Sequence, residues 1–227
     1  MENTKINDRL LTAVEFVRCG KRFCDVGTDH AYLPIYLIGK GLIDSAIAAD
    51  INKGPLDKAR ENVNKYGLSG QVELVLCDGL SKIAPDAVDD IAIFGMGGEL
   101  IVKIISEAPW LKSKGKRLIL QPMTHPEKLR EHLASNGFKV IGEALSFDRE
   151  KIYQTVCAEY DGVVRSYDDF VLQYGAFNLE KDGELLRRLM KSDRNKLLRR
   201  IEGKRAGNED SSTEVALLEK IEEYIAR

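Results

Sequence analysis

Short apolar runs recur along the first 160 residues, and most are followed by a segment with the apolar spacing of a helix. Five of these runs are predicted strands: Arg22–Val26, Ser45–Asp50, Val72–Leu76, Asp90–Phe94 and Lys116–Leu120. The predicted helices are residues 6–18, Ala31–Ile38, Asn52–Tyr66, a segment from the glycines after Phe94 to about Glu107, and a segment from His125 to near Gly137. Strands that alternate with helices indicate a parallel sheet.

Two longer extended runs follow, Phe138–Phe147 and Lys151–Tyr160, and only Asp148-Arg149-Glu150 separates them. So short a connection predicts an antiparallel hairpin. The predicted fold class is therefore α/β, a Rossmann-like sheet that is mostly parallel with an antiparallel hairpin at its edge. A polar stretch, Asp161–Asp169, is the predicted boundary, with one domain at residues 1–162 and a second at residues 163–227.

The second domain is predicted to be a helical hairpin, because two amphipathic segments flank a polar loop at Gly203–Ser212. The first apolar stripe comprises Leu185, Leu186, Leu189, Met190, Leu197, Leu198 and Ile201, and the second comprises Val215, Leu217, Leu218, Ile221, Tyr224 and Ile225. Residues 187–205 hold nine Lys or Arg and two acids, a local charge of +7, whereas the other arm is acidic. Two interpretations stay open, interhelical salt bridges and a phosphate-binding face.

Composition sets limits on what the chain does. The formal charge of −2 shows no overall basic character, and 44% of the 227 residues are hydrophobic, which is normal for a globular protein. No apolar run approaches the roughly 18 residues of a membrane span, and the polar N-terminal segment does not resemble a signal peptide. Four cysteines lack C-x-x-C spacing. We expect a cytoplasmic protein without disulfides, structural metal, membrane contact or a stable protein partner.

The candidate ligand site begins where the first predicted strand ends, at Asp25-Val26-Gly27-Thr28-Asp29. Gly27 has no Cβ, so a ligand can approach the backbone there. A dinucleotide-binding G-x-G-x-x-G would need glycines at Asp29 and Tyr32, and two acids would repel a pyrophosphate. A ligand that carries cations fits better, and S-adenosylmethionine offers a sulfonium and an ammonium. The alternative is an ordinary strand-turn-helix with Asp29 as the helix N-cap.

Two further acids follow the next strands. Asp50, at the end of the second strand, is placed to accept both ribose hydroxyls of a nucleoside, and Asp78, after the third, can receive an exocyclic amine of adenine. The fourth strand ends in Gly95-Met96-Gly97-Gly98, which offers backbone groups and an apolar contact, as suits attack by a ring nitrogen. The alternative is that these glycines only let the chain turn.

Several of these motifs resemble those of bacterial tRNA (adenine-N(1))-methyltransferases of the TrmK type. The stretch from Cys24 to Pro34 resembles the first motif of that family, and Ile93–Gly98 resembles the fourth. Leu118–Pro122, Lys151–Tyr153 and the pairs Asp169-Phe170 and Tyr174-Gly175 are similar to later signatures. The family usually has a proline near Ala176, and this departure concerns the entry into a helix and not the chemistry.

The resemblance implies transfer of a methyl group from S-adenosylmethionine to N(1) of adenine 22 in the D-arm of tRNA. It also implies a Rossmann-like domain followed by a coiled-coil helical hairpin. The predicted cofactor-binding residues are Asp25, Gly27, Thr28, Asp50, Ile51, Cys77, Asp78, Gly79, Gly95, Met96 and Gly97. The predicted substrate-binding residues are Tyr32, Gln121, Pro122, Tyr153, Arg188, Arg194 and Arg199. No metal ligands are predicted.

Asp29 and His30 are the predicted catalytic residues, because a methylated adenine is cationic until its exocyclic nitrogen loses a proton, and an acid or imidazole can stabilise that charge or accept the proton. For His30 the alternative is a helix-start residue bonded to backbone.

Three other functions remain open on the sequence alone. A nicotinamide-dependent dehydrogenase lacks support from a G-x-G-x-x-G motif. A non-catalytic RNA-binding protein would have little use for acids at three successive strand ends. A small-molecule methyltransferase would leave the basic segment unexplained.

Overall fold

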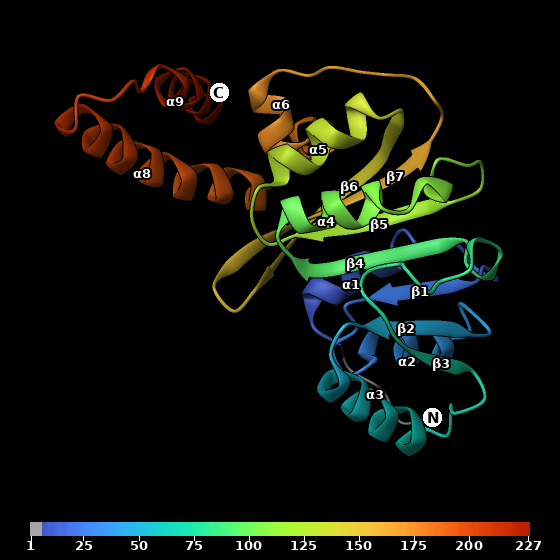
Figure 1. The fold of residues 1–227 in the computed structure, drawn as a ribbon. Coiled ribbons are helices and arrows are strands. Elements are labelled where there is room, and N and C mark those ends of the chain that lie inside the picture. Colours follow the sequence, from blue (N-terminus) through green and yellow to red (C-terminus); the bar gives the residue numbers. More distant parts are fainter. Residues whose placement is uncertain (1–5) are drawn as a thin grey trace. The chain divides into compact units, whose positions relative to one another are not determined.

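The structure, a computed structural model, describes residues 6–227. Within them the sheet has seven strands in the order β3-β2-β1-β4-β5-β7-β6 (Figure 1). The strands are β1 (Phe23–Val26), β2 (Ala46–Asp50), β3 (Val72–Leu76), β4 (Asp90–Met96), β5 (Arg117–Pro122), β6 (Phe138–Asp148) and β7 (Lys151–Tyr160). The first five are parallel, and β7 pairs antiparallel with both β5 and β6. The predicted mostly parallel sheet with an antiparallel edge hairpin is confirmed.

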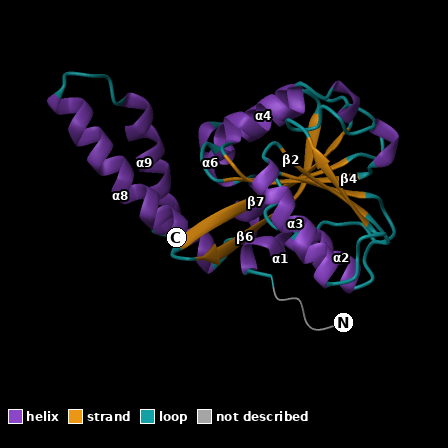
Figure 2. Cartoon of the chain, turned by 60° about the horizontal axis from the view of Figure 1, so that its bottom comes forward, coloured by secondary structure: helices purple, strands orange, loops and turns teal. Residues whose placement is uncertain are grey.

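One helix precedes the first strand, and α-helices follow β1, β2, β4 and β5, as the alternating pattern predicts. They are α1 (Asp8–Val14), α2 (Tyr32–Gly39), α3 (Lys53–Lys65), α4 (Gly98–Ser106) and α5 (Pro126–Ser135), with short 3-10 helices η1 (Pro85–Ala87) and η2 (Pro109–Leu111). Asn7 caps α1 by accepting a hydrogen bond from the Leu10 N–H at 3.0 Å. The described helices cover both faces of the sheet (Figure 2).

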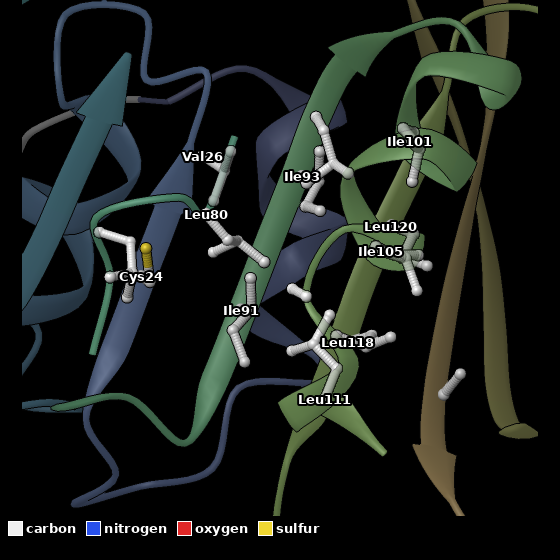
Figure 3. Close-up of a cluster of buried hydrophobic side chains, with 14 of the residues drawn as sticks. Cys24, Val26, Leu80, Ile91, Ile93, Ile101, Ile105, Leu111, Leu118 and Leu120 are labelled. Carbon is white, nitrogen blue, oxygen red and sulfur yellow. The ribbon is translucent and has the colours of Figure 1, made fainter. Parts of the chain in front are cut away.

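The core lies in two layers because neighbouring residues of a strand point to opposite faces. In β4, Ile91 and Ile93 pack with α4 and α5, whereas Ala92 and Phe94 pack with α1, α2 and α3. Figure 3 shows the first layer, in which Leu118 and Leu120 of β5 lie near Ile105 of α4, and Cys24 and Val26 of β1 lie on the other side of Ile91 and Ile93. A sheet covered on both faces explains why its strands read as nearly continuous apolar runs.

The strand order reverses between β1 and β4. From β1 the chain builds outward through β2 and β3, and it then crosses to β4 and β5 on the other side. In open α/β sheets this switch point leaves a crevice at the carboxyl ends of the strands, where ligands bind. The loops after β1, β2, β3 and β4 all end at this edge.

Two strands run further than the sequence predicts. β4 continues through Gly95 to Met96 with a register shift after Phe94, and β5 continues through Gln121 to Pro122. The proline ends the strand because it has no N–H for the ladder. The prediction that Gln121 and Pro122 lie beyond the strand is therefore wrong.

A second compact unit begins at Tyr167. It contains α6 (Asp169–Tyr174), α7 (Ala176–Lys181), α8 (Glu184–Ala206) and α9 (Ser212–Ile225). Helix α8 passes through Gly203 and ends three residues later, so the connecting loop is shorter than the predicted Gly203–Ser212 loop. Ion pairs Arg194–Glu222 (2.9 Å) and Lys204–Glu214 (2.7 Å) show that α8 and α9 run antiparallel, because the partner numbers fall as the α8 numbers rise.

The buried side of this unit follows the predicted apolar stripes. Leu186, Met190, Leu197 and Ile201 of α8 and Ile221 of α9 are buried. Tyr174 is also fully buried, and its ring meets Phe170, which in turn packs against Tyr224. The Tyr224 hydroxyl donates to the Leu179 carbonyl at 2.8 Å, so α9 is tied to α7. No helix among residues 6–227 is both long and apolar enough to cross a membrane.

Candidate functional site

A cavity of about 630 Å³ opens at the carboxyl edge of the sheet. Its floor is formed by the loops after β1, β2, β3 and β4. The side walls come from the start of α1, from α4 and from the tip of the β6–β7 hairpin. The predicted site residues that line it are Asp25, Gly27, Asp29, Tyr32, Asp50, Ile51, Cys77, Asp78, Gly79, Gly95, Met96 and Tyr153. Residues from seven separate segments of the chain therefore meet where the strand order predicts a crevice.

The first loop fits only glycine at position 27. Gly27 has φ +75°, and a Cβ there would lie 2.3 Å from the Met96 side-chain methyl carbon. The N–H groups of Gly27 and Thr28 both donate to the Ala49 carbonyl, at 2.8 and 2.9 Å, which fixes the loop against the end of β2. Because Gly27 has no side chain, the Met96 methyl group can pack against the loop, and the glycine lines the cavity with backbone alone.

Asp25 is a buried carboxyl at the floor of the cavity. Its side chain accepts a hydrogen bond from the Thr28 hydroxyl at 2.7 Å. Burial raises the pKa of Asp25 to about 6, while the Thr28 hydrogen bond and the charge of Arg9 oppose that rise, and Asp29 and Asp50 add to it. A cationic ligand in the cavity would favour the ionised form of Asp25. Thr28 itself is fully buried, so its role is to hold Asp25.

Asp29 and His30 form a pair at the cavity mouth. His30 Nε2 lies 2.9 Å from Asp29 Oδ1, and the His30 ring stacks on Tyr32 with centroids 5.4 Å apart. Asp29 lines the cavity, whereas His30 stands behind it, out of the lining. Asp29 is 76% exposed and does not cap α2, whose N-cap residue is Ala31 without a side-chain cap. The N-cap alternative for Asp29 is therefore wrong, and the His30 ring is bonded to Asp29 and not to backbone.

This loop also carries backbone strain. His30 and Ala31 have φ of +64° and +55°, a left-handed conformation that costs non-glycine residues about 1–2 kcal/mol each. Such strain is maintained only where the surroundings enforce it, and it gathers at functional sites. Here the Asn62 amide donates to the His30 carbonyl at 3.0 Å, so α3 helps hold the loop.

The ends of β2 and β3 form the acidic side of the cavity. Asp50 Oδ1 accepts from the Asn52 N–H at 2.7 Å, which orients the carboxylate at the end of β2. The Cys77 N–H donates to the Asp50 carbonyl at 3.0 Å, which joins the two loops, and the Cys77 thiol bonds to the Gly79 carbonyl at 3.4 Å. Asp78 is exposed beside them. Both carboxylates can accept from hydroxyl or amine donors of a nucleoside.

The glycines after β4 have separable roles. Gly95 has φ +76° and lines the cavity, but Gly97 does not line it. A Cβ on Gly98 would lie 2.2 Å from the His125 carbonyl oxygen, so this position is glycine because the loop after β5 packs against it. For Gly98, therefore, the alternative holds that the glycine only lets the chain turn. Gly95 and Met96 instead line the cavity.

Several lining residues escaped the sequence analysis, among them Asn7 and Arg9 at the start of α1, and Asp148 and Arg149 at the hairpin tip. The Asn7 amide donates to Asp148 at 3.1 Å and joins these two segments. Arg9 lies over the Tyr153 ring, 5.6 Å from its centroid. The periodicity of residues 6–18 predicts a helix but cannot tell that its first turn faces the site. The signal that was available in the sequence is an arginine, Arg9, within that first turn.

The structure contradicts two predicted substrate contacts in the first unit. Gln121 is fully buried, and its amide donates to the Arg9 carbonyl (3.0 Å) and to Thr155 (2.8 Å). Pro122 is buried in β5 as well. Successive side chains of β5 point to opposite faces of the sheet, and this alternation continues past Leu120. The Gln121 side chain therefore points to the face that α1 covers. Neither residue lines the cavity.

In the second unit Arg194, a predicted substrate contact, forms an ion pair. Its Nε donates to Glu222 at 2.9 Å, so this arginine takes part in the interhelical salt bridging that was the other interpretation of the basic segment. Arg188 and Arg199 are exposed. With about 100° per residue they lie on nearly the same side of α8, roughly opposite the buried Leu186 and Leu197.

The cavity suits S-adenosylmethionine on its own geometry. Gly27 and Gly95 line it without side chains, two carboxylates stand at the ends of β2 and β3, and the buried Asp25 would be stabilised as an anion by a cation. Among the described residues no cluster of His, Cys, Asp and Glu could hold a metal ion.

Comparison with known proteins gives a consistent result. A model described as a methyltransferase domain matches residues 6–156. The chain is 38% identical to tRNA (adenine(22)-N(1))-methyltransferase of Bacillus subtilis over 77% of this chain and 74% of that protein. The chain belongs to the tRNA (adenine(22)-N(1))-methyltransferase family.

Solved structures that resemble this member of the tRNA (adenine(22)-N(1))-methyltransferase family extend over both units. One is Streptococcus pneumoniae Sp1610, a putative tRNA (m1A22) methyltransferase, in complex with S-adenosyl-L-methionine, at 31% identity and a TM-score of 0.87 over 97% of this chain and all of that one. Another is B. subtilis TrmK, an M1A22 tRNA methyltransferase, at 28% identity and a TM-score of 0.82 over 99% and 97% of the two chains. The helices of the second unit are therefore a feature of the family fold.

Proposed function

We propose that this protein transfers the methyl group of S-adenosylmethionine to N(1) of adenine 22 in tRNA. The observation that supports this most directly is the cavity at the switch point, where Gly27, Asp25, Asp50 and Asp78 meet, in a chain that belongs to this family. Its relative from S. pneumoniae is described in complex with the same cofactor.

In the proposed site, Asp50 accepts the ribose hydroxyls, Asp78 accepts the adenine amine, and Gly27, Gly95 and Met96 pack along the cofactor. The bound cofactor supplies an electrophilic methyl group on a sulfonium. Adenine N(1) attacks with its own lone pair, so the chain needs no strong base before the attack. Its main contributions are to align the base and to exclude water.

Methylation leaves a positive charge on the base, and a proton is then lost from the exocyclic nitrogen. We assign the stabilisation of that charge to Asp29, which lines the cavity mouth, with His30 as the residue that orients it through the 2.9 Å contact. The carboxylate can accept the proton, and the imidazole can pass it to solvent. This revises the equal roles that the sequence predicts for the two residues.

The tRNA is larger than the cavity, so further contacts are needed outside it. We propose that Arg188 and Arg199, on the side of α8 roughly opposite its buried stripe, bind phosphates of the tRNA backbone. They are about 16 Å apart along the helix axis, a span that crosses several phosphates.

The test is transfer of a radiolabelled methyl group to unmodified tRNA, followed by nucleoside mapping. We expect 1-methyladenine at position 22 and no transfer to a tRNA with guanine at that position. Asp50→Ala should weaken cofactor binding by about 1–3 kcal/mol, the value of a lost charge-assisted hydrogen-bond pair. Label at another position or in a small molecule would overturn the proposed substrate, and unchanged cofactor affinity in Asp50→Ala would overturn the role of Asp50.

A further inference from the structure

Arg9 occupies a distinctive place in the cavity. Its described lining contains five carboxylates, those of Asp25, Asp29, Asp50, Asp78 and Asp148, but only two guanidinium groups, those of Arg9 and Arg149. A ligand with an anionic end would be repelled over most of this surface. S-adenosylmethionine has such an end, because its amino-acid half carries a carboxylate beside the ammonium. Among the described lining residues, these two arginines are the cationic side chains that can offset that charge.

We propose that Arg9 binds the carboxylate of the cofactor's amino-acid half and so selects for a ligand that carries it. The inference rests on the proposed use of S-adenosylmethionine. Arg9 is the arginine closer to the floor of the cavity, since its Nη1 would lie 3.7 Å from a Cβ placed on Gly95. Its positive charge also acts on the Asp25 carboxyl. The guanidinium therefore lies over the ends of β1 and β4.

That location matches the length of the ligand. Asp50 and Asp78, at the ends of β2 and β3, are suited to the nucleoside. The nucleoside and the amino acid form opposite ends of S-adenosylmethionine, so a ligand whose ribose lies at β2 extends its amino-acid end across β1 toward β4. Asp25 then faces the ammonium and Arg9 the carboxylate. Each charged group of the ligand's amino-acid end thus faces a side chain of opposite charge.

The Arg9 side chain is held in place before any ligand binds. Gln121 Oε1 accepts from Nη1 at 3.4 Å, and the Tyr153 ring lies 5.6 Å from the guanidinium carbon. Gln121 is itself fixed by its bonds to the Arg9 carbonyl and to Thr155. Within residues 6–227, Gln121 Oε1 accepts a hydrogen bond from this guanidinium, which has five N–H donors. Donors remain for a carboxylate, which arginine can bind with two parallel hydrogen bonds.

This arrangement gives Gln121 a purpose that differs from the predicted substrate contact. From its buried position on β5, Gln121 positions Arg9 through hydrogen bonds with the Arg9 guanidinium and carbonyl. Arg149 is less suited to the same task, because it is exposed at the tip of the hairpin.

The test compares two ligands that differ in the amino-acid half. S-adenosylhomocysteine carries the carboxylate, and 5′-methylthioadenosine has the same nucleoside and sulfur without it. In Arg9→Met the dissociation constant of S-adenosylhomocysteine, measured by calorimetry, should rise about 10- to 100-fold, the effect of losing a hydrogen-bonded charge pair. The dissociation constant of 5′-methylthioadenosine should stay unchanged. Arg9→Lys should recover part of the loss.

Arg60→Met serves as the matched control, because Arg60 is an exposed arginine on α3 outside the cavity. It should change neither constant. Equal losses for both ligands in Arg9→Met would overturn the proposal and make Arg9 a support of the pocket. An unchanged S-adenosylhomocysteine constant with a raised KM for tRNA would also overturn it, in favour of an RNA phosphate contact. A native chain that binds neither S-adenosylhomocysteine nor S-adenosylmethionine would instead refute the proposed function.

Discussion

Asp25 is a carboxyl group whose charge depends on what occupies the cavity. Burial raises its pKa to about 6, above the ordinary value of 3.8. The folded protein therefore binds more protons than the unfolded chain between these two values. Without a ligand, this residue makes the folded state less stable as the pH rises from about 4 to about 6. A cation in the cavity reverses the preference, because it favours the ionised carboxylate.

The first prediction concerns the pH dependence of cofactor binding. If only ionised Asp25 binds S-adenosylmethionine well, a pKa near 6 makes the dissociation constant about tenfold higher at pH 5 than at pH 7.5. Calorimetry across this range measures it. Asp25→Asn should bind more weakly at pH 7.5 and should show a flat profile from pH 5 to 7.5. A profile in the variant that matches the native one would assign the titration to another group.

The second prediction concerns Asp29. Because its proposed partner is the reacting base, Asp29→Ala should lower kcat by about 100-fold or more while the cofactor dissociation constant changes by less than about threefold. Single-turnover methylation of tRNA and calorimetry measure the two effects. His30→Gln should have a smaller effect in the same direction, since His30 acts through Asp29. Equal losses in rate and cofactor affinity for Asp29→Ala would move Asp29 to the cofactor site.

At the residue scale, the sequence predicts the positions of the acidic side chains of the site better than those of its arginines. Asp25, Asp50 and Asp78 could be placed because each follows an apolar strand, and the ends of parallel strands share one edge of a sheet. Arg9 and Arg149 could not, because their position depends on how a leading helix and a hairpin tip fold back over that edge. Gln121 was misplaced for a related reason: the apolar run ends at Leu120, but the strand does not.

Between elements, one buried ion pair joins α5 to the antiparallel hairpin. Arg130 of α5 donates to Glu143 of β6 at 2.7 Å and to Gln154 of β7 at 2.8 Å, and both charged side chains are almost completely buried. The same hairpin brings Tyr153 and Arg149 to the cavity. Its position relative to the parallel strands therefore depends on a polar contact as well as on strand pairing.

The third prediction follows from this pair. Arg130→Met leaves the Glu143 carboxylate buried without its cation and should lower the free energy of unfolding by about 3–5 kcal/mol, measured in denaturant. The double variant Arg130→Met, Glu143→Leu removes both charges and should regain most of that loss. If the double variant is as unstable as the single one, packing of the arginine stem and not the charge accounts for the effect.

Most element boundaries agree with the predictions to within two residues, because glycine and proline punctuate the chain at the same places where the periodicity changes. The sequence does not predict helices α6 and α7 as two separate elements. Six residues each give too little periodicity, and the turn between them rests on Gly175, at φ +85°. The sequence predicts that Gly203 lies in a loop, but α8 continues past it because Leu197 and Ile201 keep that part of the helix packed.

At the scale of the whole molecule, each of the two units has its own buried core. The cavity and every residue that lines it belong to the first unit, which ends at Ser166. The largest concentration of positive charge belongs to the second. The proposed division of labour is that the first unit binds the cofactor and the target base, while the second contributes affinity for the RNA backbone.

The fourth prediction tests this division. Deletion of residues 167–227 should leave the S-adenosylmethionine dissociation constant nearly unchanged and abolish methylation of tRNA, because the phosphate contacts are lost. In the full chain, Arg199→Glu should raise the KM for tRNA and reduce the salt dependence of binding. Lys58→Glu, an equal change of charge on exposed α3, is the control and should do neither. A truncated chain that methylates tRNA at the full rate would leave the second unit with a structural role only.

The way the cavity is assembled has a consequence for how such a protein changes over evolutionary time. The residues proposed to hold the cofactor's nucleoside lie on loops locked to one another, as in the hydrogen bonds from Gly27 and Thr28 to Ala49 and from Cys77 to Asp50. Arg149 lies instead at an exposed hairpin tip, which can accept substitutions without disturbing any of those bonds. Substitutions at this tip can therefore alter one wall of the cavity while the loops proposed to hold the methyl donor stay unchanged.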